Sequence, residues 1–137
     1  NSNALFMLID LDHFDNINRQ FGHDVGDQVI RQLGARLLHY SSNNMFIARN
    51  SGDEFAFIIS DASGEITSLL NVHWQAIKAI INEPCIVGER KITLSCSMGG
   101  VLFPQQIDSR FDIISSAEHS IQRAKENGRN QCVVAQQ

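Results

Sequence analysis

The segment MFIARNSGDEFAFIIS, residues 45–60, decides the fold class of this chain. Two runs rich in apolar residues are joined by the short link Ser51-Gly52-Asp53, a pattern typical of a β-hairpin. Side chains alternate between the two faces of a strand. In the second run both faces are apolar, with Phe55, Phe57 and Ile59 on one and Ala56 and Ile58 on the other. The pattern therefore predicts a hairpin within a sheet that helices cover on both faces.

Further strand and helix patterns flank this hairpin. Residues 5–11 form an apolar run that predicts a buried strand. Helical spacing of apolar residues predicts long helices over 25–40, 65–82 and 111–127; a strand–turn–strand unit is expected over 85–101 and a closing strand over 131–135. Asp24 is the expected N-cap of the first long helix, and Leu38 and Ile114 are expected to face the core.

The expected order of elements is β-α-α-β-β-α-β-β-α-β. It predicts an α/β fold with a central, mostly antiparallel sheet flanked by helices. The 137 residues fit a single domain, and 43% of them are hydrophobic, which is enough to build a core. Because the first apolar run begins abruptly at Leu5, the domain is interpreted as part of a larger, multidomain protein.

Charge and cysteine content narrow the function classes. The net charge of −4 argues against a nucleic-acid partner, because proteins that bind duplexes normally carry a basic face. Three cysteines at wide spacings predict neither a disulfide framework nor a zinc site, and fit a cytoplasmic protein. No apolar run reaches the length of a membrane span. Any attachment to a membrane is therefore expected only through domains outside this chain.

Two acidic clusters stand at the ends of predicted strands. Asp10-Leu11-Asp12 ends the first strand, and Asp53-Glu54 lies at the tip of the hairpin. Magnesium prefers oxygen ligands and commonly takes one or two carboxylates together with phosphate oxygens. Acids on adjacent strand ends can supply these ligands. The alternative is a pair of solvated acidic turns with no ligand.

Two further groups of polar residues suit a nucleotide. Lys125 and Arg129 lie four apart at the end of the last helix, where cations also stabilise helices without binding anything. In the stretch 14–27, an Asn amide and an Asp carboxylate, Asn18 and Asp27, can read the edge of guanine. His23 lies between them. The alternatives are that Asp27 only stabilises a first helical turn, and that His23 is a packing or capping residue.

Three motifs together resemble the GGDEF family. The segment DLDHF (10–14), followed by Asn18 and FGHDVGD (21–27), is similar to its opening motif. The segment SGDEF (51–55) resembles its signature, and AKENGRN (124–130) its closing motif. The motifs appear in the right order and at the right spacing over nearly the whole chain.

The resemblance implies a diguanylate cyclase, which makes cyclic di-GMP from two GTP molecules, on a fold like the palm of nucleotide cyclases. Mg²⁺ (or Mn²⁺) would be held by Asp10, the carbonyl of Leu11 and Asp53. Asp53 would also help to deprotonate the ribose 3′-hydroxyl, with Glu54 supporting the metal. Each domain would bind one GTP, so catalysis would need a homodimer.

The resemblance also implies the residues that bind the substrate. The base would be lined by Asn18, His23 and Asp27, and phosphate oxygens would be held by backbone N–H groups near Phe14, by Lys125 and by Arg129.

The sequence departs from the family pattern at the phosphate end and at a turn. Asp15 stands where active relatives commonly carry a lysine, and Arg19 where an acid is common, which preserves an i,i+4 ion pair with reversed polarity. Ser51 replaces the first glycine of the signature. The family's inhibitory RxxD motif corresponds here to residues 42–45, which read SNNM and lack both charges.

These departures leave three functional hypotheses. The first is an active cyclase, favoured by the retained metal and guanine residues. The second is a degenerate GTP-binding module that regulates an attached phosphodiesterase or other output domain, favoured by Asp15 and the missing inhibitory motif. The third is a purely structural dimerisation domain, which the retained acids disfavour.

Overall fold

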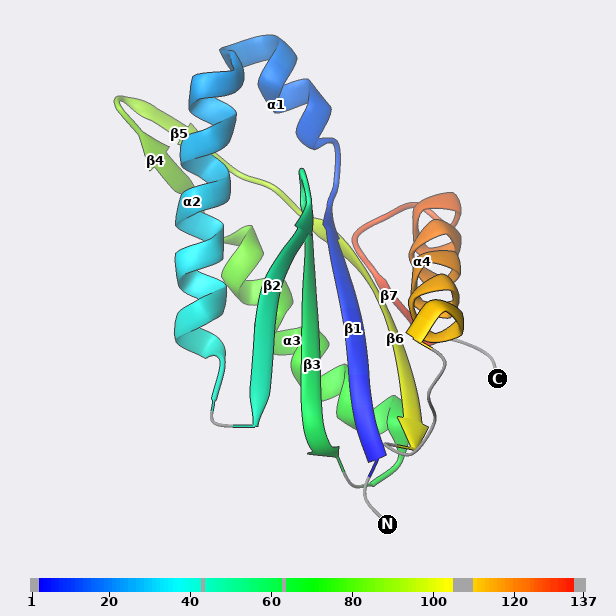
Figure 1. Ribbon diagram of the computed structural model, residues 1–137. Helices are drawn as coiled ribbons and strands as arrows, with labels where there is room; N and C mark the ends of the chain where they lie inside the picture. Colours follow the sequence, from blue (N-terminus) through cyan, green and yellow to red (C-terminus); the bar gives the residue numbers. More distant parts are fainter. Residues whose placement is uncertain (1–2, 43, 63, 105–109, 135–137) are drawn as a thin grey trace.

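The computed structural model describes residues 3–42, 44–62, 64–104 and 110–134 (Figure 1). Its main sheet has the order β2-β3-β1-β6-β7. These strands are β1 (Asn3–Leu11), β2 (Met45–Ser51), β3 (Glu54–Ala62), β6 (Cys96–Pro104) and β7 (Cys132–Val134). The helices are α1 (Phe14–Phe21), α2 (His23–Tyr40), α3 (Ile66–Asn82) and α4 (Arg110–Glu126). β1 is antiparallel to both β3 and β6, and among the described strands only β7 pairs in parallel, so the predicted fold class is confirmed.

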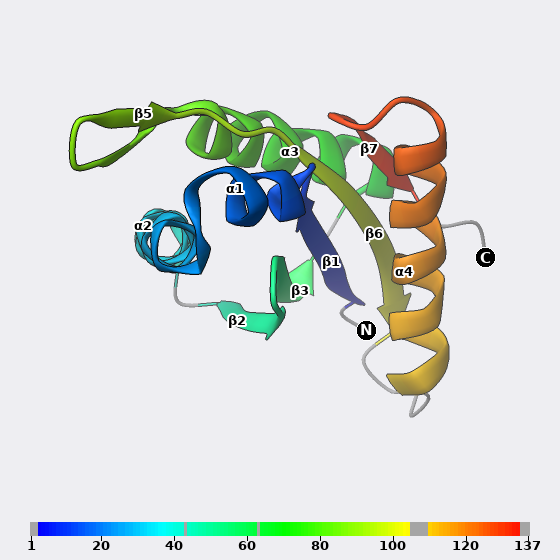
Figure 2. The same ribbon diagram turned by 90° about the horizontal axis from the view of Figure 1, so that it is seen from above.

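The helices form two layers around the sheet. Figure 2 shows α1, α2 and α3 on one face and α4 on the other. Alternate residues of β1 enter the two cores: Met7 packs in the larger one with Leu33 of α2, whereas Leu8 packs in the smaller one with Ile121 of α4. All four are nearly inaccessible to water. β1 therefore runs through the centre of the molecule, and its last residues are held rigidly.

The prediction that helices cover both faces is wrong for the outer part of the β2–β3 hairpin. Phe46 is 73% exposed and its cross-strand partner Ile58 is 40% exposed. Ile58 lies opposite Phe6 of β1, which is buried. Among the described residues α4 thus packs on β1, β6 and β7 on this face, and the apolar strip continues past the helix toward β2.

Two residues expected in the core lie on the surface instead. Leu38 is 62% exposed because its neighbour Leu37 takes the inward position on α2. Ile114 is 40% exposed, while the adjacent Ile113 packs against the smaller core. In both cases two apolar residues stand side by side in a helix, and the helical period allows only one of them to face inward.

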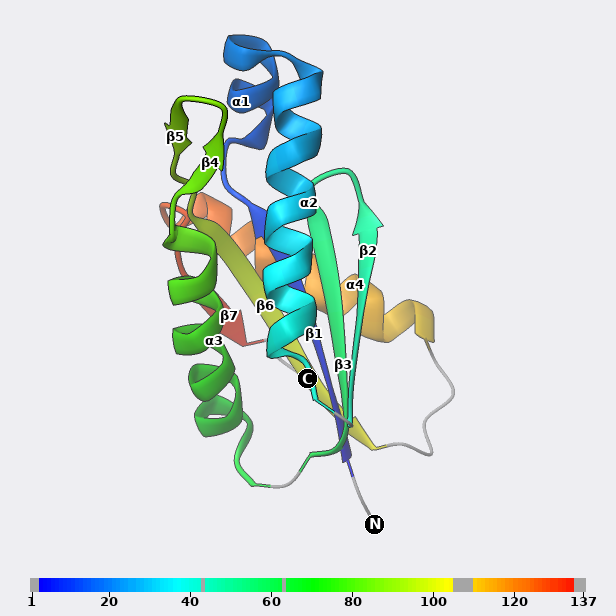
Figure 3. The ribbon, with the colours of Figure 1, turned by 90° about the vertical axis from the view of Figure 1, so that its left-hand side faces the viewer.

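The expected strand–turn–strand unit is in fact three strands. β4 (Cys85–Val87) and β5 (Arg90–Ile92) form a separate two-stranded sheet, closed at Gly88 with φ 63°. This hairpin lies against α2, where the Gln32 amide donates to the carbonyl of Ile86 at 2.8 Å (Figure 3). β6 then begins at Cys96 and enters the main sheet. The short apolar runs alone did not distinguish a continuation of the sheet from a side hairpin.

The start of α2 also differs from the prediction. Gly22, not Asp24, is the N-cap residue, and its φ of 93° suits glycine alone. Asp24 lies within the first turn, where a negative charge still interacts favourably with the helix dipole. None of the described helices has the length and apolar character that crossing a membrane requires.

Candidate active site

The end of β1 brings the two acidic clusters together. Asp10 pairs with Glu54 of β3 on one side and with Ser97 of β6 on the other. The N–H of Leu11 donates to the carbonyl of Asp53 at 3.0 Å, which fixes the hairpin tip against β1. The structure thus places the three acids expected at a metal site, Asp10, Asp53 and Glu54, at one edge of the sheet.

The carboxylate of Asp10 is buried, and only one of its two oxygens has a partner among the described residues. It follows Phe6 and Leu8 on the face covered by α4, and it is 7% exposed. Its Oδ2 lies 2.5 Å from Nζ of Lys125 on α4. Burial raises the pKa of Asp10 above its ordinary value; the hydrogen bond from Lys125 opposes this rise and the nearby Asp53 adds to it. Ionisation of Asp10 is therefore less favourable in this fold than in the unfolded chain.

The other oxygen of Asp10 is suited to a cation. Oδ1 is buried and accepts no hydrogen bond from the described residues. Such a vacancy is uncommon in native proteins, and a hard cation would satisfy it. The described residues hold no cluster of three or more His, Cys, Asp or Glu side chains suited to a metal. An ion here would take Asp10, Asp53 and a carbonyl such as that of Leu11, and complete its shell with water and phosphate oxygens, as Mg²⁺ usually does.

Asp12, grouped with the metal acids in the sequence, has a different environment. Its carboxylate accepts hydrogen bonds from the hydroxyls of Ser95 at 2.6 Å and Ser97 at 2.7 Å, and from the N–H of Asn130 at 3.0 Å. It is 4% exposed. The only sequence signal for this network is the pair of serines at alternate positions before and within β6.

The turn after α4 is unusual in its backbone. Gly128, Arg129 and Asn130 have φ values of 114°, 65° and 50°. The left-handed conformation costs a residue with a side chain about 1–2 kcal/mol, although Asn tolerates it better than Arg. The N–H of Arg129 donates to the carbonyl of Ala124 at 2.9 Å. Gly128 thus takes the C′ position expected from the sequence, and Lys125 and Arg129 flank the end of α4.

Only some of the residues expected around the guanine base lie together. Asp15, Asn18, Arg19 and His23 line an open hollow of about 430 Å³ where α1 meets α2. Asp27 is not among its lining residues. Asn18 lies directly over Gly26, the neighbour of Asp27, where an added Cβ would meet the amide oxygen at 1.9 Å. Glycine at 26 is therefore what allows the Asn18 amide to lie against α2.

The reversed ion pair predicted on α1 is present. The guanidinium of Arg19 lies 3.1 Å from the carboxylate of Asp15, and both side chains are more than two-thirds exposed. Arg19 also donates to the amide oxygen of Asn16. Asp15 is therefore neutralised by its neighbour, yet both members of the pair border the hollow that contains Asn18.

The first turn of α1 has no side-chain cap. His13, the N-cap residue, has φ 57° and makes no capping hydrogen bond with its side chain. Phe14 is buried and anchors the turn. A left-handed residue other than glycine beside a functional site is a strained feature that the sequence did not reveal.

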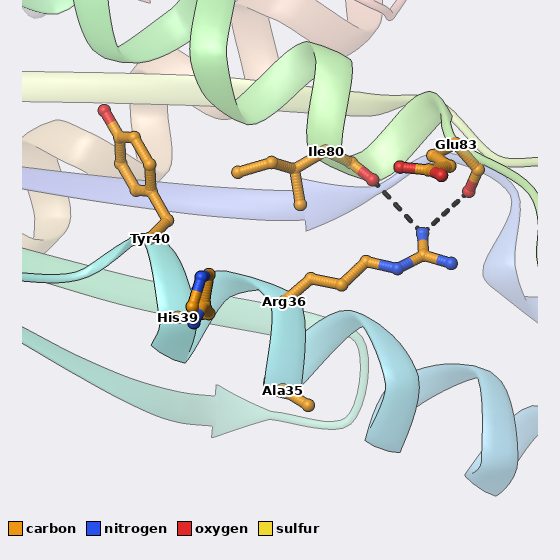
Figure 4. Close-up of a pocket in the computed structure, with 6 residues that line it drawn as sticks. All are labelled: Ala35, Arg36, His39, Tyr40, Ile80 and Glu83. Carbon is orange, nitrogen blue, oxygen red and sulfur yellow. Dashed lines mark hydrogen bonds between the residues drawn. The ribbon is translucent and has the colours of Figure 1, made fainter.

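A second hollow, between α2 and α3, has a structural explanation. It is lined by Ala35, Arg36, His39, Tyr40, Ile80 and Glu83 (Figure 4). The Arg36 guanidinium donates to the carbonyls of Ile80 at 3.2 Å and Glu83 at 2.8 Å. These are the carbonyls that the end of a helix leaves without partners. Arg36 therefore fastens α3 to α2, and its guanidinium is already engaged.

Comparisons with known proteins identify the family of this chain. The family model described as "Diguanylate cyclase, GGDEF domain" matches residues 1–131. The protein named "Probable diguanylate cyclase DgcC" of Escherichia coli (strain K12) is 35% identical over 137 residues, which cover 98% of this chain and 36% of that protein. "Cyclic di-GMP phosphodiesterase PdeR" of the same strain is 31% identical over 98% of this chain and 20% of that protein. This chain thus spans about a third or less of these relatives.

Solved structures show the same fold. The GGDEF domain of PA1120 from Pseudomonas aeruginosa superposes with a TM-score of 0.89 at 24% identity, over 99% of this chain and 84% of that one. The active GGEEF domain of a diguanylate cyclase from Vibrio cholerae superposes with a TM-score of 0.84 at 26% identity. The match covers 99% of this chain and 85% of that one. Because the family model covers nearly all of its residues, this chain belongs to the GGDEF-domain family of diguanylate cyclases.

Proposed function

We propose that this domain condenses two GTP molecules into cyclic di-GMP, as one half of a homodimer and with Mg²⁺ or Mn²⁺. The observation that carries the proposal is the Asp10 carboxylate, buried beside Asp53 with one oxygen on Lys125 and the other without a donor among the described residues. Such an arrangement is costly unless a cation completes it. A cytoplasmic location, where GTP is available, is part of the proposal.

Different residues of this chain would perform different parts of phosphoryl transfer. Asp10, the Leu11 carbonyl and Asp53 would hold the metal, which supplies Lewis acidity at the phosphate. Asp53 would accept the proton of the 3′-hydroxyl, with Glu54 beside it. The 3′-oxygen of one GTP then bonds to the α-phosphorus of the other, and pyrophosphate leaves. In a second, identical step the 3′-oxygen of the other GTP bonds to the α-phosphorus of the first, which releases the second pyrophosphate and closes the ring. Positioning and charge neutralisation account for most of such catalysis.

The binding residues would act from α1, α2 and α4. The backbone N–H groups near Phe14, in a first turn without a side-chain cap, would suit phosphate oxygens, as helix N-termini do. Lys125 and Arg129 would hold the β- and γ-phosphates, and Asn18, His23 and Asp27 the guanine. Lys125 contacts Asp10 in this structure, so its side chain would have to leave Asp10 to reach the nucleotide.

A second candidate is a GTP-binding regulatory domain without turnover. It is favoured by Asp15, a carboxylate on the rim of the hollow that contains Asn18. It is also compatible with relatives named as cyclic di-GMP phosphodiesterases, such as PdeR. Both candidates require GTP to bind, and only the first requires it to react.

Guanine selectivity is the first expected result. Replacing Asp27 with Ala should weaken GTP binding by about 1–3 kcal/mol, because donors on the base lose their acceptor. Asp24→Ala, at an exposed acid in the first turn of the same helix, should leave GTP affinity nearly unchanged. Calorimetric titration of the wild type and the two variants with GTP and ATP, in the presence of Mg²⁺, measures these affinities. Equal affinity of the wild type for the two nucleotides would contradict the guanine pocket.

The second expected result is the absence of product feedback at residues 42–45. The Ser42 hydroxyl donates to the amide oxygen of Asn44 at 3.1 Å, and neither Ser42 nor Met45 carries a charge for a phosphate; residue 43 lies outside the described segments. Cyclic di-GMP should therefore bind weakly here, and Ser42→Arg combined with Met45→Asp should increase its affinity. Submicromolar binding by the wild type that perturbs Ser42 in an NMR titration would refute the prediction.

A further inference from the structure

Asp12 lies two residues from the proposed metal ligand Asp10, but its carboxylate is already occupied. Three donors reach it: the Ser95 hydroxyl at 2.6 Å, the Ser97 hydroxyl at 2.7 Å and the backbone N–H of Asn130 at 3.0 Å. With 4% of its surface exposed, it has little capacity left for an ion or a substrate. Its role in the site must therefore be exerted through the groups that it holds.

The backbone group that Asp12 holds belongs to the turn after α4. Gly128, Arg129 and Asn130 are all left-handed, and for a residue such as Arg129 this conformation persists only where the surroundings fix it. The bond from Asn130 to Asp12 is the contact that ties this turn to the end of β1. The conformation of the turn sets the direction in which the Arg129 side chain leaves the backbone.

We infer that Asp12 is a positioning residue that locks the turn 128–130 and so holds Arg129, and the end of α4 that carries Lys125, in place for the substrate phosphates. The inference rests on the proposed function of that site. Lys125 contacts Asp10 in the present structure and must leave it to reach a phosphate. The bond between Asp12 and the Asn130 backbone involves neither Lys125 nor Asp10, so it can fix the turn 128–130 while the Lys125 side chain moves.

The hydrogen-bond chemistry defines a conservative replacement. A backbone N–H can only donate, whereas the serine hydroxyls can donate or accept. An Asn at position 12 can turn its oxygen toward Asn130 and Ser95 and donate its amide to Ser97. Asp12→Asn therefore keeps the turn in place, and Asp12→Ala releases it.

The test compares GTP with GMP, which lacks the β- and γ-phosphates, by calorimetric or NMR titration with Mg²⁺. Asp12→Ala should weaken GTP binding at least about tenfold, the effect of one charge-assisted hydrogen bond, and leave GMP binding nearly unchanged. Asp12→Asn should restore GTP binding. Ser97→Ala removes another partner of the same carboxylate without touching the turn, and should leave the GTP-to-GMP ratio as in the wild type.

The outcomes separate the inference from the proposed function. Asp12→Ala binding GTP as tightly as the wild type, or losing GTP and GMP in equal measure, would overturn the positioning role. If Asp12→Ala does not fold, hydrogen exchange of the Asn130 amide in the wild type decides: we expect strong protection, and exchange at the rate of an open turn overturns the inference. A wild type that binds no GTP would instead contradict the proposed function.

Discussion

Replacing Asp10 with Asn should abolish cyclic di-GMP formation and leave the metal-free protein at least as stable as the wild type. The carboxylate is buried, its Oδ1 has no donor among the described residues, and its pKa is raised. Loss of a metal ligand removes several kcal/mol of charge stabilisation from the transition state, which corresponds to about 10³-fold or more in rate. Lys125 loses its partner in this variant but is 28% exposed and can reach water.

The pH dependence of stability provides an independent measurement. Because the pKa of Asp10 is raised in the folded state, that state binds the proton more tightly than the unfolded chain does. The stability of the wild type therefore falls as pH rises from the unfolded pKa, 3.8, through the folded one, and stays reduced above it. Asn does not titrate, so the advantage of Asp10→Asn should be largest at neutral pH and disappear below the unfolded pKa.

Urea unfolding of both proteins without Mg²⁺, between about pH 3 and 8, measures this difference. Asp24→Asn, which removes an exposed carboxylate from the first turn of α2, serves as the control. It should not be more stable than the wild type, because that charge interacts favourably with the helix dipole. An Asp10→Asn variant that is clearly less stable than the wild type at neutral pH would show that the Lys125 ion pair outweighs burial. The site would then be complete without a metal.

Exchanging the Asp15–Arg19 pair should give the second large effect. A carboxylate about 5 Å from a phosphate would cost roughly 3 kcal/mol at an effective dielectric near 20, or about two decades in rate. The exposure of Asp15 and its 3.1 Å contact with Arg19 reduce this cost. We therefore expect Asp15→Lys with Arg19→Asp to turn over faster than the wild type, by up to about a hundredfold.

The single variant isolates the contribution of the ion pair. Asp15→Lys alone places two cations four residues apart on α1 and should destabilise the helix by a few tenths of a kcal/mol. Its rate should lie between those of the wild type and the double variant. Cyclic di-GMP formation by the three dimeric proteins is the measurement. A wild type at least as fast as the double variant would show that Asp15 does not impair the site.

Local patterns were sufficient to predict the hairpin and the long helices. The link at Ser51-Gly52-Asp53 and the alternation through Phe57 depend on neighbouring residues alone, and the structure confirms them. The ion pair between Asp15 and Arg19 follows from helical spacing in the same way. These features are encoded within a few residues of the chain.

Apart from the meeting of the two acidic clusters, which the family resemblance implied, features that join distant segments were not predicted. Asp12 and Asn130 are more than a hundred residues apart, and no local pattern indicates that a backbone N–H in a turn meets a buried carboxylate. The exposure of Phe46 depends on how far α4 extends across the sheet, which is a property of the packed layers. The side hairpin near Gly88 likewise depends on α2, on which it packs.

Formation of cyclic di-GMP from GTP tests the central claim most directly. The wild-type protein in dimeric form is incubated with GTP and Mg²⁺, and the products are separated by chromatography, with Asp10→Asn in parallel. We predict cyclic di-GMP and pyrophosphate from the wild type and neither from Asp10→Asn or when EDTA is present. A wild-type dimer that binds Mg²⁺ and GTP but forms no cyclic di-GMP would contradict the cyclase assignment and identify the domain as a regulatory GTP sensor.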